Sequence, residues 1–117
     1  MSASAAQLDI ADYRRPPRAM SRRLAFLIFH SQHPDVLTRL IRLARQMVAA
    51  KKEQGVAKPK IGMRAVWEVA RWGIDCEPVT AGTKRPVLNN NLAPEYARWI
   101  SENCADLSDV FNLRERE

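Results

Sequence analysis

A single apolar stripe between Pro34 and Gln54 constrains the fold of this chain more than any other sequence feature. Apolar side chains recur there with the i, i+3, i+4, i+7 spacing of one helix face: Leu37, Leu40, Ile41, Ala44, Met47 and Val48. This period predicts one long amphipathic helix with a buried apolar face. Pro34 suits the first helical position, and Gly55 suits the left-handed residue after a helix end.

Two neighbouring segments are expected to pack on this helix. The apolar block at residues 24–30, LAFLIFH, fits a short helix, although its pattern alone does not separate a helix from a strand. Residues 61–72 form the second predicted helix, with an inner face made of Met63, Val66, Val69 and Ala70. Glu68 and Arg71 share its outer strip, where their spacing favours an ion pair within the helix.

The chain between residues 74 and 88 is expected to form a β-hairpin. Residues 74–79 and 85–88 look like two short strands around the turn TAGTKR, and Pro78 and Pro86 make both strands edge-like. A helix followed by a hairpin with a basic tip is similar to the wing of winged-helix proteins. The expected fold is therefore mainly α in the α+β class: three to five helices and one two-stranded antiparallel hairpin, arranged like a winged helix.

Three consecutive asparagines follow the expected hairpin. Asn90 or Asn91 would cap a helix that ends near Asn103. Capping uses one or two of the three asparagine side chains. The amide of the remaining asparagine can bind adenine or phosphate. Both uses of the cluster stay open. The segment DLSDVFNL then supplies a last short amphipathic piece.

Length and composition indicate one domain. The 117 residues fit a single core, which we place at residues 21–115, after a flexible basic arm at residues 1–20. The arm either follows phosphates or is only a disordered tail. No signal sequence and no apolar run near 20 residues is present, and two cysteines make no disulfide framework, so a cytoplasmic protein without a membrane partner is expected.

The charge is concentrated in the first half of the chain. The formal net charge is +6, yet the segment from Arg14 to Arg64 holds thirteen basic and two acidic residues. Such asymmetry is typical of a face that binds a polyanion, although a solvated basic surface is the plain alternative. We expect duplex DNA as the partner, bound by these residues: Arg39, Arg42, Arg45, Lys58, Lys60, Arg64, Arg71, Lys84, Arg85, Asn89, Asn90 and Asn91.

A protein partner is the alternative hypothesis. A basic surface can dock on an acidic patch of another protein, and exposure of Trp67, Trp72 or Trp99 would favour this function because tryptophan anchors interfaces. Dimerisation through the long apolar stripe is a further prediction. No catalytic motif is present, and His30 and His33 lack the ligand set that zinc needs. The chain is therefore expected to be no enzyme and to hold neither a metal nor a cofactor.

Several strings together resemble a group of small phage and prophage-encoded proteins. They are FHSQHPDV, IGMRAVWEVARW, LNNNLAPEYARWI and FNLRE, which follow the pattern F-H-x-x-x-P, E-x-x-R-W, L-N-N-N and Y-A-R over residues 26–115. The pattern falls on Phe29, His30, Pro34, Glu68, Arg71, Trp72, Leu88, Asn89, Asn90, Asn91, Tyr96, Ala97 and Arg98. The resemblance implies a phage or mobile-element origin and one compact domain. It brings no activity, and a host protein would be the partner under the alternative hypothesis.

Overall fold

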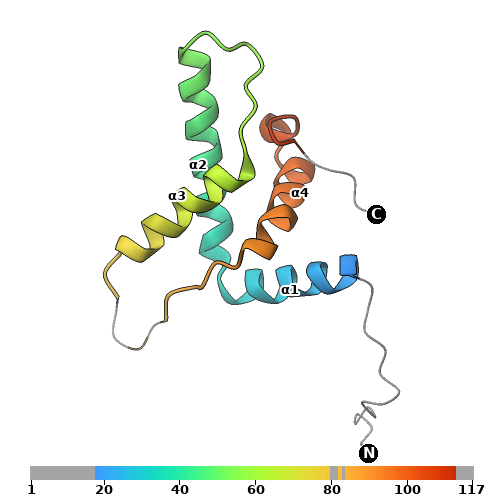
Figure 1. Ribbon diagram of the computed structural model, residues 1–117, viewed down its shortest axis with the longest axis vertical. Coiled ribbons are helices and arrows are strands. Elements are labelled where there is room, and N and C mark those ends of the chain that lie inside the picture. The colour runs from blue at the N-terminus through green and yellow to red at the C-terminus, as the bar shows by residue number, and fades with distance from the viewer. Residues whose placement is uncertain (1–17, 80–81, 83, 113–117) are drawn as a thin grey trace, which may run out of the picture.

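The computed structural model describes residues 18–79, 82 and 84–112, and it is built from helices (Figure 1). These described residues form four α-helices: α1 (Arg18–Gln32), α2 (Pro34–Glu53), α3 (Met63–Cys76) and α4 (Ala93–Asn103). Two single 3₁₀ turns, η1 (Asn90–Leu92) and η2 (Ala105–Leu107), precede and follow α4. α1 begins at Arg18, inside the arm expected at residues 1–20, and residues 1–17 of that arm lie outside the description.

The helices pack around one apolar core. α3 crosses α2 and also packs on α4, whereas α1 contacts both α2 and α4 at the lower end of the view in Figure 1. Of the predicted stripe of α2, Leu37, Leu40, Ala44 and Val48 are buried in this core, and Ile41 and Met47 are partly buried against it. Val36, which was not part of the predicted stripe, is buried as well. Because α2 packs on α3 and α1 within one chain, the stripe does not offer a free face for the predicted dimer.

The ends of α2 lie where the sequence placed them. Pro34 is the first residue of the helix, and Gly55 after its end has φ +94°, in the region that favours glycine. His33 separates α1 from α2 and makes no side-chain cap. The hydroxyl of Ser31 donates to the carbonyl of Ile28 at 2.7 Å, so Ser31 serves the end of α1 rather than the start of α2.

The predicted β-hairpin is wrong. The described residues contain no strand; the chain is helical through Cys76 and irregular at residues 77–79 and 84–89. The apolar stripe of α3 explains the difference, because Ile74 lies one turn beyond Ala70 and both side chains are buried in the core. Residues 80, 81 and 83 of the expected turn lie outside the description. The winged-helix arrangement, which depends on the hairpin, is withdrawn with it.

The segment after α4 closes the core. Leu107, Val110 and Phe111 are buried, which confirms the predicted amphipathic character of this piece. The amide of Ile61 donates to the carbonyl of Val110 at 2.8 Å, and Ile61 and Phe111 form an isolated parallel β-bridge. The start of α3 and the C-terminal segment are thereby held together across 49 residues of sequence.

Candidate interaction surface

α1 is apolar on two opposite faces. Its inner face carries Phe26, which is completely buried and meets the ring of Tyr96 edge-on at a centroid distance of 4.8 Å. Its outer face carries Leu24, Leu27 and Ile28, which are exposed by 47%, 46% and 57%. A helix with apolar residues all round is normally covered on all sides. The described chain covers only one side of α1.

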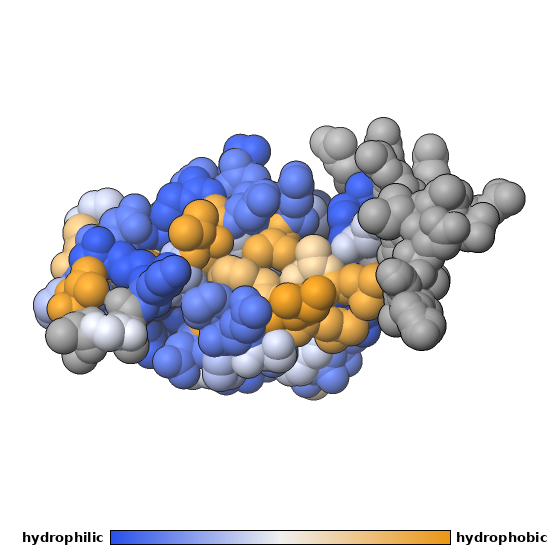
Figure 2. Space-filling model, turned by 90° about the horizontal axis from the view of Figure 1, so that it is seen from below, coloured by the Kyte–Doolittle hydropathy of each residue, from blue (hydrophilic) through white to orange (hydrophobic). Residues whose placement is uncertain are grey.

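A groove of about 590 Å³ lies beside this outer face. One wall is α1, and the other is residues 87–92, which run from the irregular segment into η1. Two of the three asparagines, Asn89 and Asn91, line the groove. Figure 2 views the molecule from the side on which α1 lies and shows hydrophobic residues gathered in a band across that face. The lining residues are Ser21, Arg22, Ala25, Ile28, Phe29, Gln32, Val87, Asn89, Asn91 and Leu92.

Arg71 holds the second wall of the groove in place. From α3 its guanidinium donates to the carbonyl of Leu88 at 2.9 Å, to the side chain of Asn90, and to Glu68 one turn earlier at 2.7 Å. The E-x-x-R and L-N-N-N strings of the phage-like pattern therefore meet in space. The predicted pairing of Arg71 with Glu68 is confirmed, and Arg71 is occupied within the chain.

The asparagine cluster is used mainly for local structure. The side chain of Asn89 accepts a hydrogen bond from the amide of Asn91 at 2.9 Å, so Asn89 caps η1, one residue before the predicted capping position. Asn90 binds Arg71. All three asparagines are exposed, and Asn89 and Asn91 line the groove.

Acidic residues of the second half neutralise several of the predicted phosphate contacts. Arg45 binds Asp106 through two hydrogen bonds of 2.9 and 3.1 Å. Lys60 donates to the carbonyl of Asp109 at 2.6 Å and to its carboxylate at 3.1 Å. Hydrogen bonding to Asp106 raises the pKa of Arg45, and the same contact lowers the pKa of Asp106. Arg45 thus links α2 to the C-terminal segment, and Lys60 links the chain just before α3 to the same segment.

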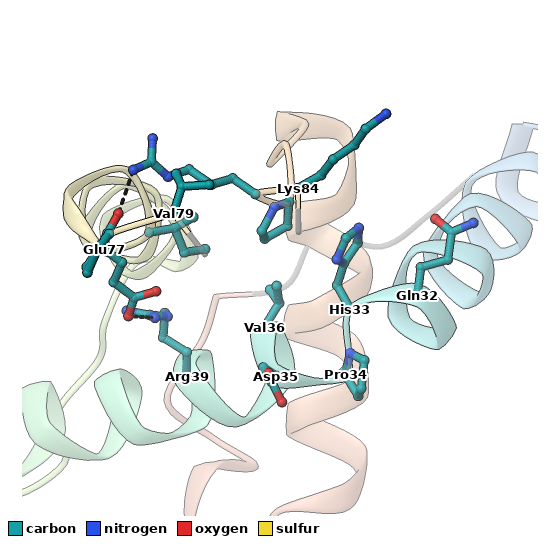
Figure 3. Close-up of a pocket in the computed structure, with 13 residues that line it drawn as sticks. Gln32, His33, Pro34, Asp35, Val36, Arg39, Glu77, Val79 and Lys84 are labelled. Carbon is teal, nitrogen blue, oxygen red and sulfur yellow. Dashed lines mark hydrogen bonds and ion pairs between the residues drawn. The ribbon is translucent and has the colours of Figure 1, made fainter. Parts of the chain in front are cut away.

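Arg39 is paired at a separate pocket of about 270 Å³ between the α1–α2 junction and residues 77–86 (Figure 3). Its guanidinium binds the carboxylate of Glu77, and Arg85 donates to the Glu77 carbonyl at 2.5 Å. Lys84 extends away from this pair in Figure 3. Asp35 also lines the pocket, so its acids and bases nearly balance.

The remaining predicted contacts are exposed and form no ion pair within the described part of the chain. They are Arg42 on α2, Lys58 in the α2–α3 connection, Arg64 on α3 and Lys84. The predicted arginine row of α2 is thus divided: Arg39 and Arg45 bind acids, and Arg42 between them does not.

The tryptophans separate into three environments. Trp72 on α3 is 69% exposed, whereas Trp67 is buried in the core and Trp99 is partly buried. Sequence analysis left all three open. The helical spacing of α3 indicates that Trp67 is buried, because Trp67 lies next to the buried Val66 and three residues before the buried Ala70.

No described group of three histidine, cysteine, aspartate or glutamate side chains lies close enough to hold a metal ion. Cys76 and Cys104 are both free thiols. Among the described helices, none has both the length and the apolar character needed to cross a membrane. Comparison with protein-family models, curated proteins and solved structures finds no match to this chain. The phage-like resemblance therefore stays a prediction.

The outer face of α1 is the feature that sequence analysis missed. The run LAFLIF contained the signal, because six consecutive apolar residues on a helix must include side chains that point away from a single neighbouring core. The run was interpreted only as a helix packed on its neighbour.

Proposed function

We propose that this chain acts by binding another protein, with the outer face of α1 as the contact surface. The single observation that carries the proposal is the exposure of Leu24, Leu27 and Ile28 beside an open groove. Adjacent exposed apolar side chains on a soluble protein mark interaction sites more often than isolated ones do. Trp72 on α3 is a further exposed side chain of the type that anchors interfaces. Under the phage-like resemblance, the partner would be a host protein.

The test is capture from a nuclease-treated bacterial lysate with the immobilised full chain, quantified by mass spectrometry. Ile28→Glu places a charge on the contact surface, and Val56→Glu introduces the same charge at an exposed valine in the α2–α3 connection. We expect a partner that is lost with Ile28→Glu and retained with Val56→Glu, with circular dichroism unchanged in both variants. Equal capture by both variants would contradict the proposal.

Nucleic-acid binding is the second candidate function. It is favoured by four of the predicted phosphate contacts, which are exposed and form no ion pair within the described residues: Arg42, Lys58, Arg64 and Lys84. The pairing of Arg39, Arg45 and Lys60 removes charge from the face on which the DNA hypothesis depended, so we place this function second.

Fluorescence anisotropy on duplex DNA tests the second candidate. If these cations contact phosphates, affinity falls steeply with salt, and Arg42→Gln with Arg64→Gln reduces the slope of log K against log[salt] by about 2. Asp35→Asn, which changes the charge at an exposed position of α2 outside the proposed contacts, serves as the control and should leave the slope unchanged. An unchanged slope in the double variant removes these residues from any DNA interface.

A further inference from the structure

The groove beside α1 has the length and periodicity of a helix-binding site. Its lining residues on α1 recur once per turn from Ser21 to Gln32, which spans three helical turns or about 16 Å. An amphipathic helix presents apolar side chains at the same i, i+4, i+7 intervals. A partner helix lying along α1 would therefore meet the groove at every turn.

The second wall does not suit an added β-strand. Strand addition requires a row of free backbone donors and acceptors. Here the amide of Asn91 donates to the Asn89 side chain, the amide of Leu92 donates to the Asn89 carbonyl at 2.9 Å, and the carbonyl of Leu88 accepts from Arg71. With these backbone groups occupied, recognition falls to side chains, as in a helix-in-groove complex.

The charge of the groove predicts which charged residues flank the apolar stripe of the partner helix. Among the described residues, the groove is lined by one cation, Arg22, and by no acid. The guanidinium of Arg23 instead lies over the ring of Phe26, on the other face of α1, at 5.9 Å. Arg22 forms no ion pair within the described residues. The N-terminal end of α1, the positive end of its dipole, lies on the same side. Both features favour carboxylates at that end of the groove.

A second copy of the chain does not supply this complement. Two α1 helices packed face to face would bring together two groove linings in which no described residue is acidic, so Arg22 of each copy would meet no counter-charge. The apolar stripe of α2 is buried in the core, so it is not available to bind a second copy either.

We propose that the groove binds an amphipathic helix of a partner protein, with aspartate or glutamate beside its apolar stripe at the Arg22 end. This inference rests on the proposed function and adds the chemistry of the partner to it.

A yeast-displayed library of 16-residue helical peptides tests it. Each peptide carries apolar residues at i, i+4, i+7 and i+11, with Glu, Lys or Gln varied at the flanking positions. Clones are sorted for binding to the full chain and for loss of binding to Ile28→Glu. We expect enrichment of Glu over Lys at one end, and about two- to fivefold weaker binding to the Arg22→Gln variant. Lys52→Gln, an exposed lysine at the far end of α2, is the matched control and should leave binding unchanged.

Each other outcome overturns the inference. Clones that depend on Ile28 but show no Glu preference reject the acidic partner and leave the proposed function standing. The absence of Ile28-dependent clones rejects the helical partner. Sedimentation of a dimer that Ile28→Glu dissociates would place a second copy in the groove, and nuclear Overhauser contacts from Ile28 methyls to Leu8 or Ile10 would place the chain's own N-terminal segment there. Failure of the proposed function is seen separately, in lysate capture.

Discussion

Arg45 of α2 and Asp106 of η2 form a two-bonded ion pair, with Nε to Oδ2 at 2.9 Å and Nη2 to Oδ1 at 3.1 Å. The planar guanidinium matches the carboxylate in this geometry, and both bonds are charge-assisted. Arg45 therefore ties α2 to the segment that closes the core. A residue that by sequence alone fits a row of phosphate contacts is instead part of the fold.

The first prediction concerns Asp106→Asn. The pKa of Asp106 lies below its ordinary value of 3.8 because Arg45 donates hydrogen bonds to the carboxylate. A lowered pKa in the folded state adds stability above the unfolded pKa, and this contribution is lost as pH falls through the folded pKa. We expect the variant to melt below the wild type at pH 7 and to converge with it toward pH 2. Both side chains are about half exposed, so high salt should reduce the difference.

Thermal melts from pH 2 to 7 at low and high salt provide the measurement. Asp109→Asn is the matched control, because its carboxylate is 88% exposed and should matter less. A melting difference for Asp106→Asn that did not change with pH would show that the ion pair is not its source.

The second prediction concerns Tyr96→Phe. Tyr96 is completely buried, burial raises the pKa of its phenol, and its hydroxyl has no hydrogen-bond partner among the described residues. Removing an unpaired buried hydroxyl should leave the free energy of unfolding unchanged or raise it by up to about 1 kcal/mol. Tyr96→Ala, which also removes the ring contacts with Phe26 and Trp67, should lower it by about 3–5 kcal/mol.

Alkaline pH gives a second readout for Tyr96. Because the phenol pKa is raised in the folded state, the wild type should lose stability as pH rises above about 10, where the unfolded chain ionises. Tyr96→Phe should lose less over the same interval in urea melts. A clear destabilisation of Tyr96→Phe at neutral pH would instead reveal a partner for the hydroxyl.

The success of sequence analysis followed the periodicity of each segment. The 20 residues of α2 offered many repeats of one period together with Pro34 at the start, and the element was predicted to within one residue. Residues 74–79 were ambiguous, because Ile74 fits both an alternating strand and the helix turn that begins at Ala70. Only its burial against the core selects the helix.

The candidate site was harder to predict because it depends on distant contacts. Arg45 and Asp106 are separated by 61 residues, and Arg71 and Asn90 by 19. Charge counts identify both arginines as surface cations without showing which acid each one meets. For the same reason, LAFLIF could be assigned to a helix, but not to a helix with one side uncovered.

The third prediction concerns the wall of the groove. Arg71→Met keeps most of the side-chain stem and removes every donor to Leu88, Asn90 and Glu68. Loss of bonds from a charged donor to a partly buried carbonyl should lower the free energy of unfolding by about 1–3 kcal/mol. Amide hydrogen exchange at residues 88–92 should also become faster. Arg64→Met, at an exposed position earlier in α3, is the control; equal exchange in both variants would mean that Arg71 does not position this wall.

The fourth prediction concerns Gly73 on α3. A Cβ built at this glycine would lie 2.9 Å from Nη1 of Arg39, closer than real Cβ contacts allow, so Arg39 has to shift when the side chain is added. Alanine inside a helix is favoured over glycine by about 0.5–1 kcal/mol. In the wild-type background the shift of Arg39 disturbs its pairing with Glu77 and offsets part of that gain.

In an Arg39→Met background the guanidinium that obstructs the new Cβ is absent, so Gly73→Ala should yield the full gain. A double-mutant cycle on urea unfolding measures the difference. Equal gains in the two backgrounds would show that Gly73 makes no room for the Arg39–Glu77 pair.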